Sequence, residues 1–322
     1  MLLDAAARHI DYLRISVTDR CNLRCRYCMP AAGVPEVGHA EVLRYEEIAA
    51  FVEVAAGEGI GSVRLTGGEP LARLGCSDLV RMLRAIAGVG EVSLTTNGTL
   101  LARHAGALRE AGLQRVNIGI PSLDHETYRR VTRGGNLEDA LAGLEAAFVH
   151  GFAPVKVNVV MLRGVNDDPV SFVELTRRLP VEVRFIEYMP IGPEDPRSFF
   201  VPASDVLARL RKLGPWEDVE ALPGQGPTQR AFRLPGAPGR LACIAPVSSH
   251  FCGACNRLRL TADGRLRLCL LSPREIDLKP ALRPQPDAAA LRARLQQAMT
   301  EKPRRMEDQS DDFGRAMSQI GG

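Results

Sequence analysis

The segment Tyr12-Leu-Arg-Ile-Ser-Val-Thr-Asp-Arg-Cys-Asn-Leu-Arg-Cys-Arg-Tyr-Cys28 decides the fold, because it joins a candidate strand to a run of cysteines. Residues 12–17 form a short run that predicts a buried strand, and the polar Thr18-Asp19-Arg20 follows it directly. Three cysteines then come in C-x3-C-x2-C spacing, at Cys21, Cys25 and Cys28. The segment therefore places a cysteine site just after the first strand.

Short β-branched runs alternate with helical patterns over the first two thirds of the chain. The predicted strands are Tyr12–Val17, Ser62–Thr66, Val92–Thr96, Arg115–Ile120, Val155–Val160 and Val183–Tyr188. The predicted helices are Tyr45–Gly57, Ser77–Ala87, Ala102–Ala111, Leu137–His150, Pro169–Arg178 and Ala203–Lys212. Six β-then-α units in a row predict an α/β fold with a parallel sheet and crossover helices.

The residues that follow the predicted strands distinguish a barrel from an open sheet. Polar or glycine-rich residues follow almost every strand, as in Gly67-Gly68-Glu69-Pro70, Asn97-Gly98, Pro121-Ser122 and Met189-Pro190. A barrel mouth gathers the C-terminal ends of all its strands into one site, whereas an open sheet uses mainly its switch point. We therefore predict a partial (β/α)6 barrel over residues 1–215.

Residues 216–322 differ in composition from the first part of the chain and are predicted to form a smaller C-terminal region. Proline and glycine become dense, as in the segment Leu222–Pro227. Short strands are expected at Arg240–Ile244, Arg257–Thr261 and Arg265–Leu270, with a hairpin turn at Asp263-Gly264. A final helix is expected over Ala288–Thr300, and the charged tail from Glu301 is expected to be mobile.

The cysteine run of the opening segment fits an iron–sulfur cubane. Three thiolates can hold three of its irons and leave the fourth open to another ligand. A zinc site would prefer a second cysteine pair or histidines, and no histidine lies near Cys28. A disulfide framework belongs to small secreted chains, whereas this chain has 322 residues and no apparent signal peptide.

A second cysteine set has C-x2-C-x13-C spacing and comprises Cys252, Cys255 and Cys269. Cys269 is expected on the strand after the hairpin turn, which returns it towards the pair. Cys243 or His250 is a possible fourth ligand. The spacing alone leaves zinc and a second cluster equally open. Cys76, and Cys243 if it is no ligand, are expected to be buried, inert thiols.

Basic residues recur on the predicted strands, at Arg14, Arg64, Lys156, Arg184, Arg257 and Arg259. A charge on a barrel strand faces the mouth, a partner or solvent. Taken together the set predicts a pocket for a ligand with several phosphates, and the alternative is a set of independent solvated charges. The net charge of +3 and an aromatic content of 5% count against a zinc-dependent nucleic-acid-binding module. The missing signal and oxygen-sensitive clusters predict a cytoplasmic location.

Several motifs in order resemble the GTP 3′,8-cyclase family of the radical S-adenosylmethionine superfamily, whose members carry out the first step of molybdenum cofactor biosynthesis. The resemblance runs from Leu13 to the end of the chain. The motifs are Thr18–Pro30, Arg64–Leu71, Thr95-Thr-Asn-Gly98, Lys156–Val160, Arg184–Met189 and Phe251–Thr261. A peptide-modifying enzyme of the same superfamily is the alternative, although such enzymes usually carry more C-terminal cysteines.

The resemblance implies a lyase with two [4Fe–4S] clusters, one on each cysteine set, which converts GTP to 3′,8-cyclo-7,8-dihydro-GTP. Contacts to S-adenosylmethionine are implied for Tyr27, Gly68, Gly119 and Met189. Contacts to GTP are implied for Arg14, Arg64, Thr95, Lys156, Arg184, Arg257, Leu258 and Arg259. An electron donor of the flavodoxin or ferredoxin type is expected. The next pathway enzyme is a partner by metabolism only, and the chain is expected to be a monomer or homodimer.

Two features depart from the family or stay open. Gly119 lacks the hydroxyl that the family usually presents to S-adenosylmethionine, and Pro121 replaces an acid, so a contact there would come from backbone or water. The terminal Gly321-Gly322 resembles a family tail that inserts into the active site. Without the resemblance, these two glycines are predicted to be a disordered chain end.

Overall fold

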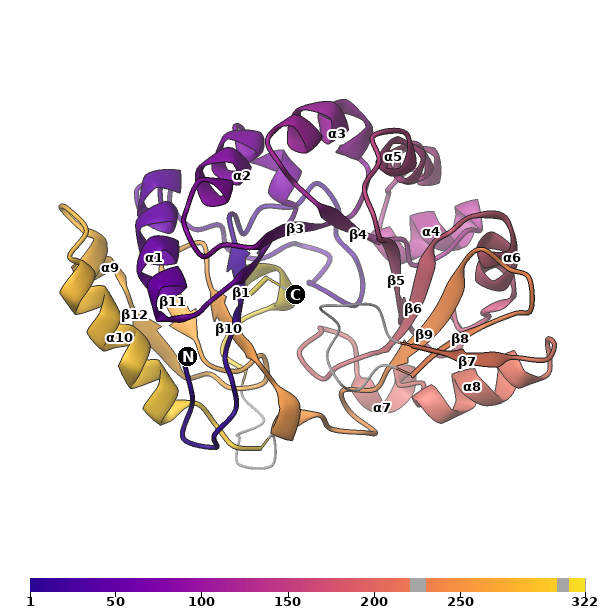
Figure 1. Ribbon diagram of the computed structural model, residues 1–322. Coiled ribbons are helices and arrows are strands. Elements are labelled where there is room, and N and C mark those ends of the chain that lie inside the picture. Colours follow the sequence, from indigo (N-terminus) through magenta and orange to yellow (C-terminus); the bar gives the residue numbers. More distant parts are fainter. Residues whose placement is uncertain (221–229, 306–312, 322) are drawn as a thin grey trace.

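The computed structural model describes residues 1–220, 230–305 and 313–321, and one strongly curved sheet runs through them. Its central strands are parallel and lie in chain order: β1 (Tyr12–Ser16), β2 (Ser62–Thr66), β3 (Glu91–Thr96), β4 (Arg115–Gly119), β5 (Val155–Met161) and β6 (Glu182–Glu187). They form the arch in Figure 1. The predicted partial (β/α)6 barrel is confirmed, and each predicted strand bound lies within one residue of the observed one.

Helices cover the outside of the arch (Figure 1). They are α1 (Tyr45–Glu58), α2 (Cys76–Arg84), α3 (Leu101–Glu110), α4 (His125–Thr132), α5 (Leu137–Val149), α6 (Val170–Arg178) and α8 (Ala203–Arg211). Helix α4 was not predicted, because its sequence is mostly polar and only Tyr128, Val131 and Thr132 are buried. Its sequence signal is the N-cap Asp124, whose side chain accepts a hydrogen bond from the Thr127 N–H.

The C-terminal region extends both edges of this sheet. At one edge β9 (Arg240–Ile244) pairs with β6, followed by β8 (Arg230–Arg233) and β7 (Glu217–Val219). At the other edge β10 (Arg257–Leu260) pairs with β1, followed by β11 (Arg265–Arg267) and β12 (Glu275–Asp277). The C-terminal region also contains the short helix α9 (Lys279–Leu282) and the longer α10 (Ala288–Glu301), and the short helix α7 (Pro196–Phe199) precedes it. The strands of the C-terminal region therefore continue the barrel wall, and the division at residue 215 stays a prediction.

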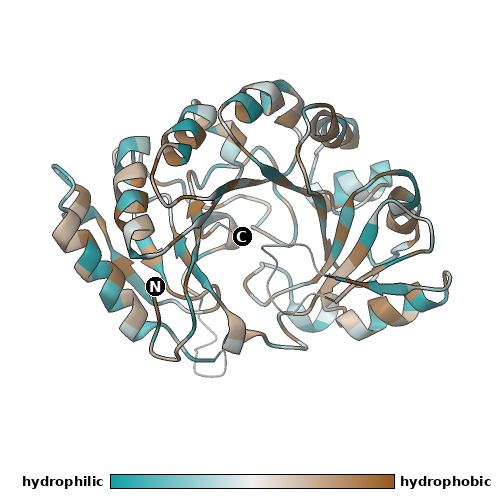
Figure 2. Cartoon of the chain, in the orientation of Figure 1, coloured by the Kyte–Doolittle hydropathy of each residue, from teal (hydrophilic) through white to brown (hydrophobic). Residues whose placement is uncertain are grey.

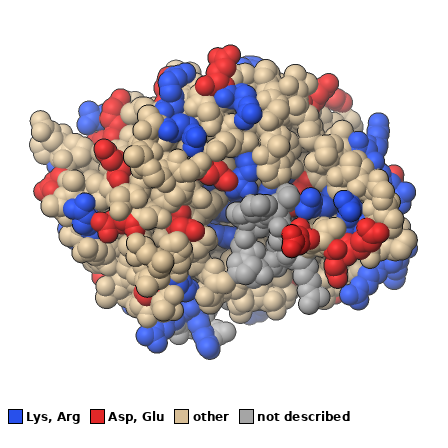
Figure 3. Space-filling model, in the orientation of Figure 1, with Lys and Arg blue, Asp and Glu red and all other residues tan. Residues whose placement is uncertain are grey.

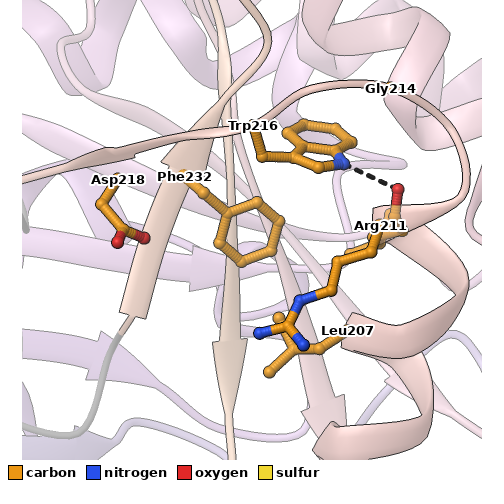
Figure 4. Close-up of a pocket in the computed structure, with 7 residues that line it drawn as sticks. Leu207, Arg211, Gly214, Trp216, Asp218 and Phe232 are labelled. Carbon is orange, nitrogen blue, oxygen red and sulfur yellow. Dashed lines mark hydrogen bonds between the residues drawn. The ribbon is translucent and has the colours of Figure 1, made fainter.

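Aromatic side chains pack the outermost strands at the β7 edge of the sheet against α8 (Figure 4). Trp216 meets Phe232 edge-on with ring centroids 5.4 Å apart, and its indole N–H donates to the Leu210 carbonyl at 2.7 Å. A small cavity of about 280 Å³ lies here, and no cysteine lines it. The predicted loop Leu222–Pro227 falls outside the described residues.

The central strands alternate between an apolar outer face and a polar inner face. Leu13, Ile15 and Val63 are fully buried in the hydrophobic core. Arg14 lies between Arg64 of β2 and Arg259 of β10 in the sheet register, so these three side chains share the inner face. The teal and brown of Figure 2 alternate along the strands in the same way. The apolar contacts thus hold the helices outside, while the interior of the barrel is left polar.

Two predictions in the C-terminal region are wrong. Strand β11 ends at Arg267 instead of Leu270, because the Arg267 side chain turns back and donates to the carbonyls of Cys269 and Leu270, both at 3.2 Å. Cys269 therefore lies in a loop. The tail is also packed where it is described, since Phe313, Met317 and Ile320 form an apolar cluster. Residues 306–312 lie outside the described part of the chain.

Candidate active site

A cavity of about 410 Å³ runs along the inner side of the central strands, from residues at their starts, such as Asp11 and Ser62, to residues after their ends, such as Gly67 and Gly68, and we call it the central cavity. Basic side chains are visible in the hollow at the centre of the face shown in Figure 3. Both cysteine sets line this cavity, which brings residues almost 250 positions apart onto one site. Most of the other predicted site residues also line it: Tyr27, Gly68, Gly119, Met189, Arg14, Arg64, Thr95, Arg184, Arg257 and Arg259.

The first cysteine set lies in the loop after β1, as the sequence predicted. The loop is stapled to the end of α4, because the backbone N–H groups of Arg24 and Arg26 donate to Thr132 and Val131 at 3.1 and 2.9 Å. The sulfur of Cys21 accepts the Leu23 N–H at 3.4 Å. These contacts fix the direction of the loop and aim its sulfur atoms at the central cavity.

The thiols of the first set favour the neutral form in the absence of a cation. Burial raises the pKa of Cys21 to about 11. Burial and the neighbouring Cys21 raise the pKa of Cys25 to about 12, and burial and Cys25 raise the pKa of Cys28 well above its ordinary value. One buried and two half-buried thiols on one cavity wall need a positively charged centre to ionise together. The set therefore fits a metal cluster.

The Gly67-Gly68-Glu69 turn after β2 packs against the same loop. A Cβ atom on Gly68 would lie 2.3 Å from the Arg20 carbonyl oxygen, so only glycine permits this approach. Glu69 is fully buried and accepts hydrogen bonds from the Thr96 hydroxyl at 2.7 Å and the Asn97 N–H at 2.8 Å. Burial raises its pKa to about 7. The sequence reasoning did not single out Glu69, although a carboxylate inside a Gly-Gly-Glu-Pro strand end is a usable signal.

The second cysteine set lies across the cavity, where the short helix η2 (Cys252–Ala254) leads into β10. The loop before it is held by Glu187 of β6, which accepts the N–H groups of Val247 and Ser248 at 2.9 Å each. Burial opposes ionisation of Cys255, but the Lys302 ammonium, a backbone hydrogen bond from Arg257 and the charges of Arg257 and Arg8 together lower the pKa of that thiol. The second set thus differs from the first in having a buried cation beside it.

The remaining cysteine predictions can now be placed. Cys76 and Cys243 are almost fully buried in the hydrophobic core, and burial raises the pKa of each to about 12, which confirms the prediction of buried thiols. Neither Cys243 nor His250 lines the central cavity. His250 Nδ1 lies instead 2.8 Å from the Pro246 carbonyl oxygen. The structure therefore offers three cysteines, without either candidate fourth ligand, at the second site.

The spacing of these sulfur atoms bears on the choice between zinc and a cluster. Among the described residues, no three cysteine, histidine or acidic side chains gather closely enough to hold a single metal ion. A zinc ion needs ligands about 2.3 Å from one centre, whereas a cubane spreads its cysteines over separate irons. Two open sets of three cysteines on one cavity therefore fit clusters better than zinc.

The arginines on the inner wall have few anionic partners. No carboxylate in the described part of the chain forms an ion pair with Arg14, Arg64, Arg257 or Arg259, and the buried Nε of Arg14 has no hydrogen-bond partner. Burial and the neighbouring arginines lower the pKa of Arg64 to about 9. Buried or half-buried guanidinium groups without a carboxylate partner are costly unless a ligand supplies negative charge. The wall is thus suited to a polyanion.

Two predicted substrate residues do not line the central cavity. Lys156 is 1% exposed and lies 3.7 Å from Glu182, which also pairs with Arg184 at 2.7 Å. Burial and Arg184 lower the Lys156 pKa to about 6. Lys156 therefore lies next to Arg184 but outside the cavity lining, with Glu182 between them. Leu258 packs in the hydrophobic core, so only its backbone could meet a ligand.

The tail reaches the barrel interior. Met317 lines the central cavity, and the Gly321 carbonyl accepts a hydrogen bond from Arg259 at 2.6 Å. Gly321 has φ +69°, and a Cβ atom there would lie 2.3 Å from the Thr66 hydroxyl oxygen. The last described residue therefore lies beside β1, β2 and β10.

Comparisons with known proteins agree with this geometry. Residues 15–176 match the Radical SAM superfamily, and residues 181–308 match the Molybdenum Cofactor Synthesis C family. The structure resembles Streptococcus suis SuiB bound to S-adenosylmethionine, with a TM-score of 0.64 at 13% identity, covering 88% of this chain and 68% of that one. That likeness supports the fold. The barrel and its cysteine loop thus define a radical S-adenosylmethionine enzyme.

Curated relatives narrow the assignment. The chain is 50% identical to the GTP 3′,8-cyclase of Moorella thermoacetica over 325 residues, with 99% of both chains covered. It is 48% identical to that of Heliobacterium modesticaldum over 328 residues, with both covered in full. The chain belongs to the GTP 3′,8-cyclase family. In the described residues, no helix is long and apolar enough to cross a membrane.

Proposed function

We propose that the chain converts GTP to 3′,8-cyclo-7,8-dihydro-GTP, the first step of molybdenum cofactor biosynthesis. One observation carries the proposal: two open three-cysteine sets line the same cavity, and unpaired arginines line its wall. The iron without a cysteine ligand in the first cluster would bind S-adenosylmethionine, and the corresponding iron in the second cluster would bind the substrate. The full-length similarity to named GTP 3′,8-cyclases supports the same assignment.

Cys21, Cys25 and Cys28 would hold the first [4Fe–4S] cluster. When bound, that cluster and S-adenosylmethionine together supply the radical chemistry. The protein positions the cofactor through Tyr27, the backbone around Gly68 and Met189, all of which line the cavity beside the first set. Gly119 also lines it, so a backbone contact there remains available despite the missing hydroxyl.

Cys252, Cys255 and Cys269 would hold the second cluster, with the purine of GTP towards its open corner. The triphosphate would be bound by Arg14, Arg64, Arg184, Arg257 and Arg259, because guanidinium forks match phosphate oxygens. Thr95 adds a hydroxyl to the same wall. Lys156 would act indirectly, by supporting the position of Arg184 through the Glu182 carboxylate that both contact.

The remaining proposals concern the surroundings of the reaction. The tail near Gly321 closes the cavity from inside the barrel and keeps bulk water from the substrate. A one-electron donor of the flavodoxin or ferredoxin type would reduce the clusters. Such clusters favour a reducing compartment, so we place the chain in the cytoplasm as a monomer or homodimer. The next pathway enzyme consumes its product.

The direct test is turnover under anaerobic conditions by the reconstituted full chain with S-adenosylmethionine and dithionite. We expect 5′-deoxyadenosine and cyclised nucleotide to form in equal amounts when GTP is present. ATP, which has the same triphosphate, should give no cyclised product. The proposal fails if GTP leaves the release of 5′-deoxyadenosine unchanged, or if a peptide supports it instead.

A further inference from the structure

Lys302 lines the central cavity but has no role in the proposed binding of GTP or S-adenosylmethionine. It lies just after α10, is 4% exposed, and lines the central cavity beside the second cysteine set. Its ammonium group donates to the Leu268 carbonyl at 2.6 Å and to the Arg257 carbonyl at 2.8 Å. These two residues lie one position before Cys269 and two positions after Cys255. One buried cation thus ties together the two segments that carry these cysteines.

Arg8 makes the corresponding contact to the third cysteine. It is 7% exposed and donates to the Cys252 carbonyl at 2.7 Å. Its other guanidinium nitrogen donates to the Pro303 carbonyl at 2.7 Å, directly after Lys302. The Asp4 carboxylate holds the guanidinium group from the opposite side at 2.6 Å. The N-terminal segment and the end of α10 therefore meet at the second cysteine set.

The choice of lysine at position 302 is informative because lysine is rare in this chain. The sequence contains only four: Lys156, Lys212, Lys279 and Lys302. No carboxylate in the described part of the chain forms an ion pair with Lys302, and burying an ammonium without one is costly. Three thiolates on a neighbouring cluster would supply that missing negative charge.

We propose that Lys302 and Arg8 are positioning residues that clamp the second cysteine set and raise the reduction potential of the cluster bound there. A buried positive charge favours the more negative, reduced form of a cluster, and the low dielectric of the interior strengthens the effect. The first set has a weaker counterpart, because Arg24 and Arg133 donate to nearby carbonyls from partly exposed positions. The inference rests on the proposed second cluster.

The test is a redox titration of the second cluster, followed by electron paramagnetic resonance. The background is the full chain with Cys21, Cys25 and Cys28 replaced by alanine, so that only the second cluster contributes. In that background Lys302→Met is expected to lower the midpoint potential by about 59 mV, a tenfold change in a one-electron equilibrium. Lys302→Arg should keep the parent potential. Lys212→Met, at an exposed residue beyond α8, is the matched control.

Each outcome decides the inference. A Lys302→Met variant with a full cluster and the parent potential overturns it. Loss of that cluster with circular dichroism unchanged, and its return in Lys302→Arg, supports the clamp. If neither Lys302 variant folds, Arg8→Met decides, since a full cluster at the parent potential would contradict the proposal. Absence of iron from the parent background points instead to failure of the proposed second cluster.

Discussion

Cys252→Ala is expected to abolish the cyclised nucleotide while leaving the first cluster intact. Cys252 lines the central cavity on the side opposite the first cysteine set, so its loss removes one ligand of the second cluster without touching the loop after β1. A substrate that loses its anchor is misplaced, and misplacement by an ångström costs about 100-fold in rate. Product formation should therefore fall at least about 100-fold, as measured by chromatography of the nucleotide products.

The matched control is Cys243→Ala, the same substitution at a buried thiol outside the cavity. It should keep both clusters and most of the activity. If Cys252→Ala made cyclised nucleotide at the rate of the parent protein, the second cluster would not be the anchor of the substrate.

Gly321→Ala has the second largest expected effect. The added Cβ would lie 2.3 Å from the Thr66 hydroxyl oxygen inside a packed barrel, and the residue would keep φ +69°, which disfavours any side chain. The tail should leave its place against Arg259, so the cavity opens to water. We expect turnover to fall by about tenfold or more, equivalent to about 1.4 kcal/mol or more, while both clusters remain.

Gly314→Ala separates the clash from the backbone strain. Gly314 has φ +68°, but a Cβ atom there would meet only the Pro273 side chain at an ordinary 3.7 Å. It should therefore lower activity much less than Gly321→Ala. Equal losses in the two variants would show that strain anywhere in the tail, and not its insertion at Thr66, explains the effect.

The sequence predicted the barrel well because its signals are local. Each central strand is a short run rich in β-branched residues that is followed by polar residues. The first cysteine set lies within a single loop, and the second lies around one hairpin. Both wall arginines of β10 were predicted from their alternation alone, since Arg257 and Arg259 must share one face. The strands added at the sheet edges could not be placed, because pairing between β10 and β1 joins residues that are about 245 positions apart.

The residues that were missed act through burial and long-range contacts. Glu69 lies in a quoted motif, yet its fully buried carboxylate shows only in the packing of β2 against β3. Lys302 belongs to a stretch that reads as a charged, mobile tail, and its partners are carbonyls that no residue pattern marks. Lys156 shows the converse, because its motif points to the substrate while its buried side chain does not line the cavity.

Iron and acid-labile sulfide per chain test the central claim most directly. If both cysteine sets carry cubane clusters, the anaerobically reconstituted protein contains about eight irons and eight sulfides. The first-set triple alanine variant and Cys252→Ala should each retain about four of both. About four irons accompanied by one zinc in the parent protein would contradict the account, because the site across the cavity would then be closed.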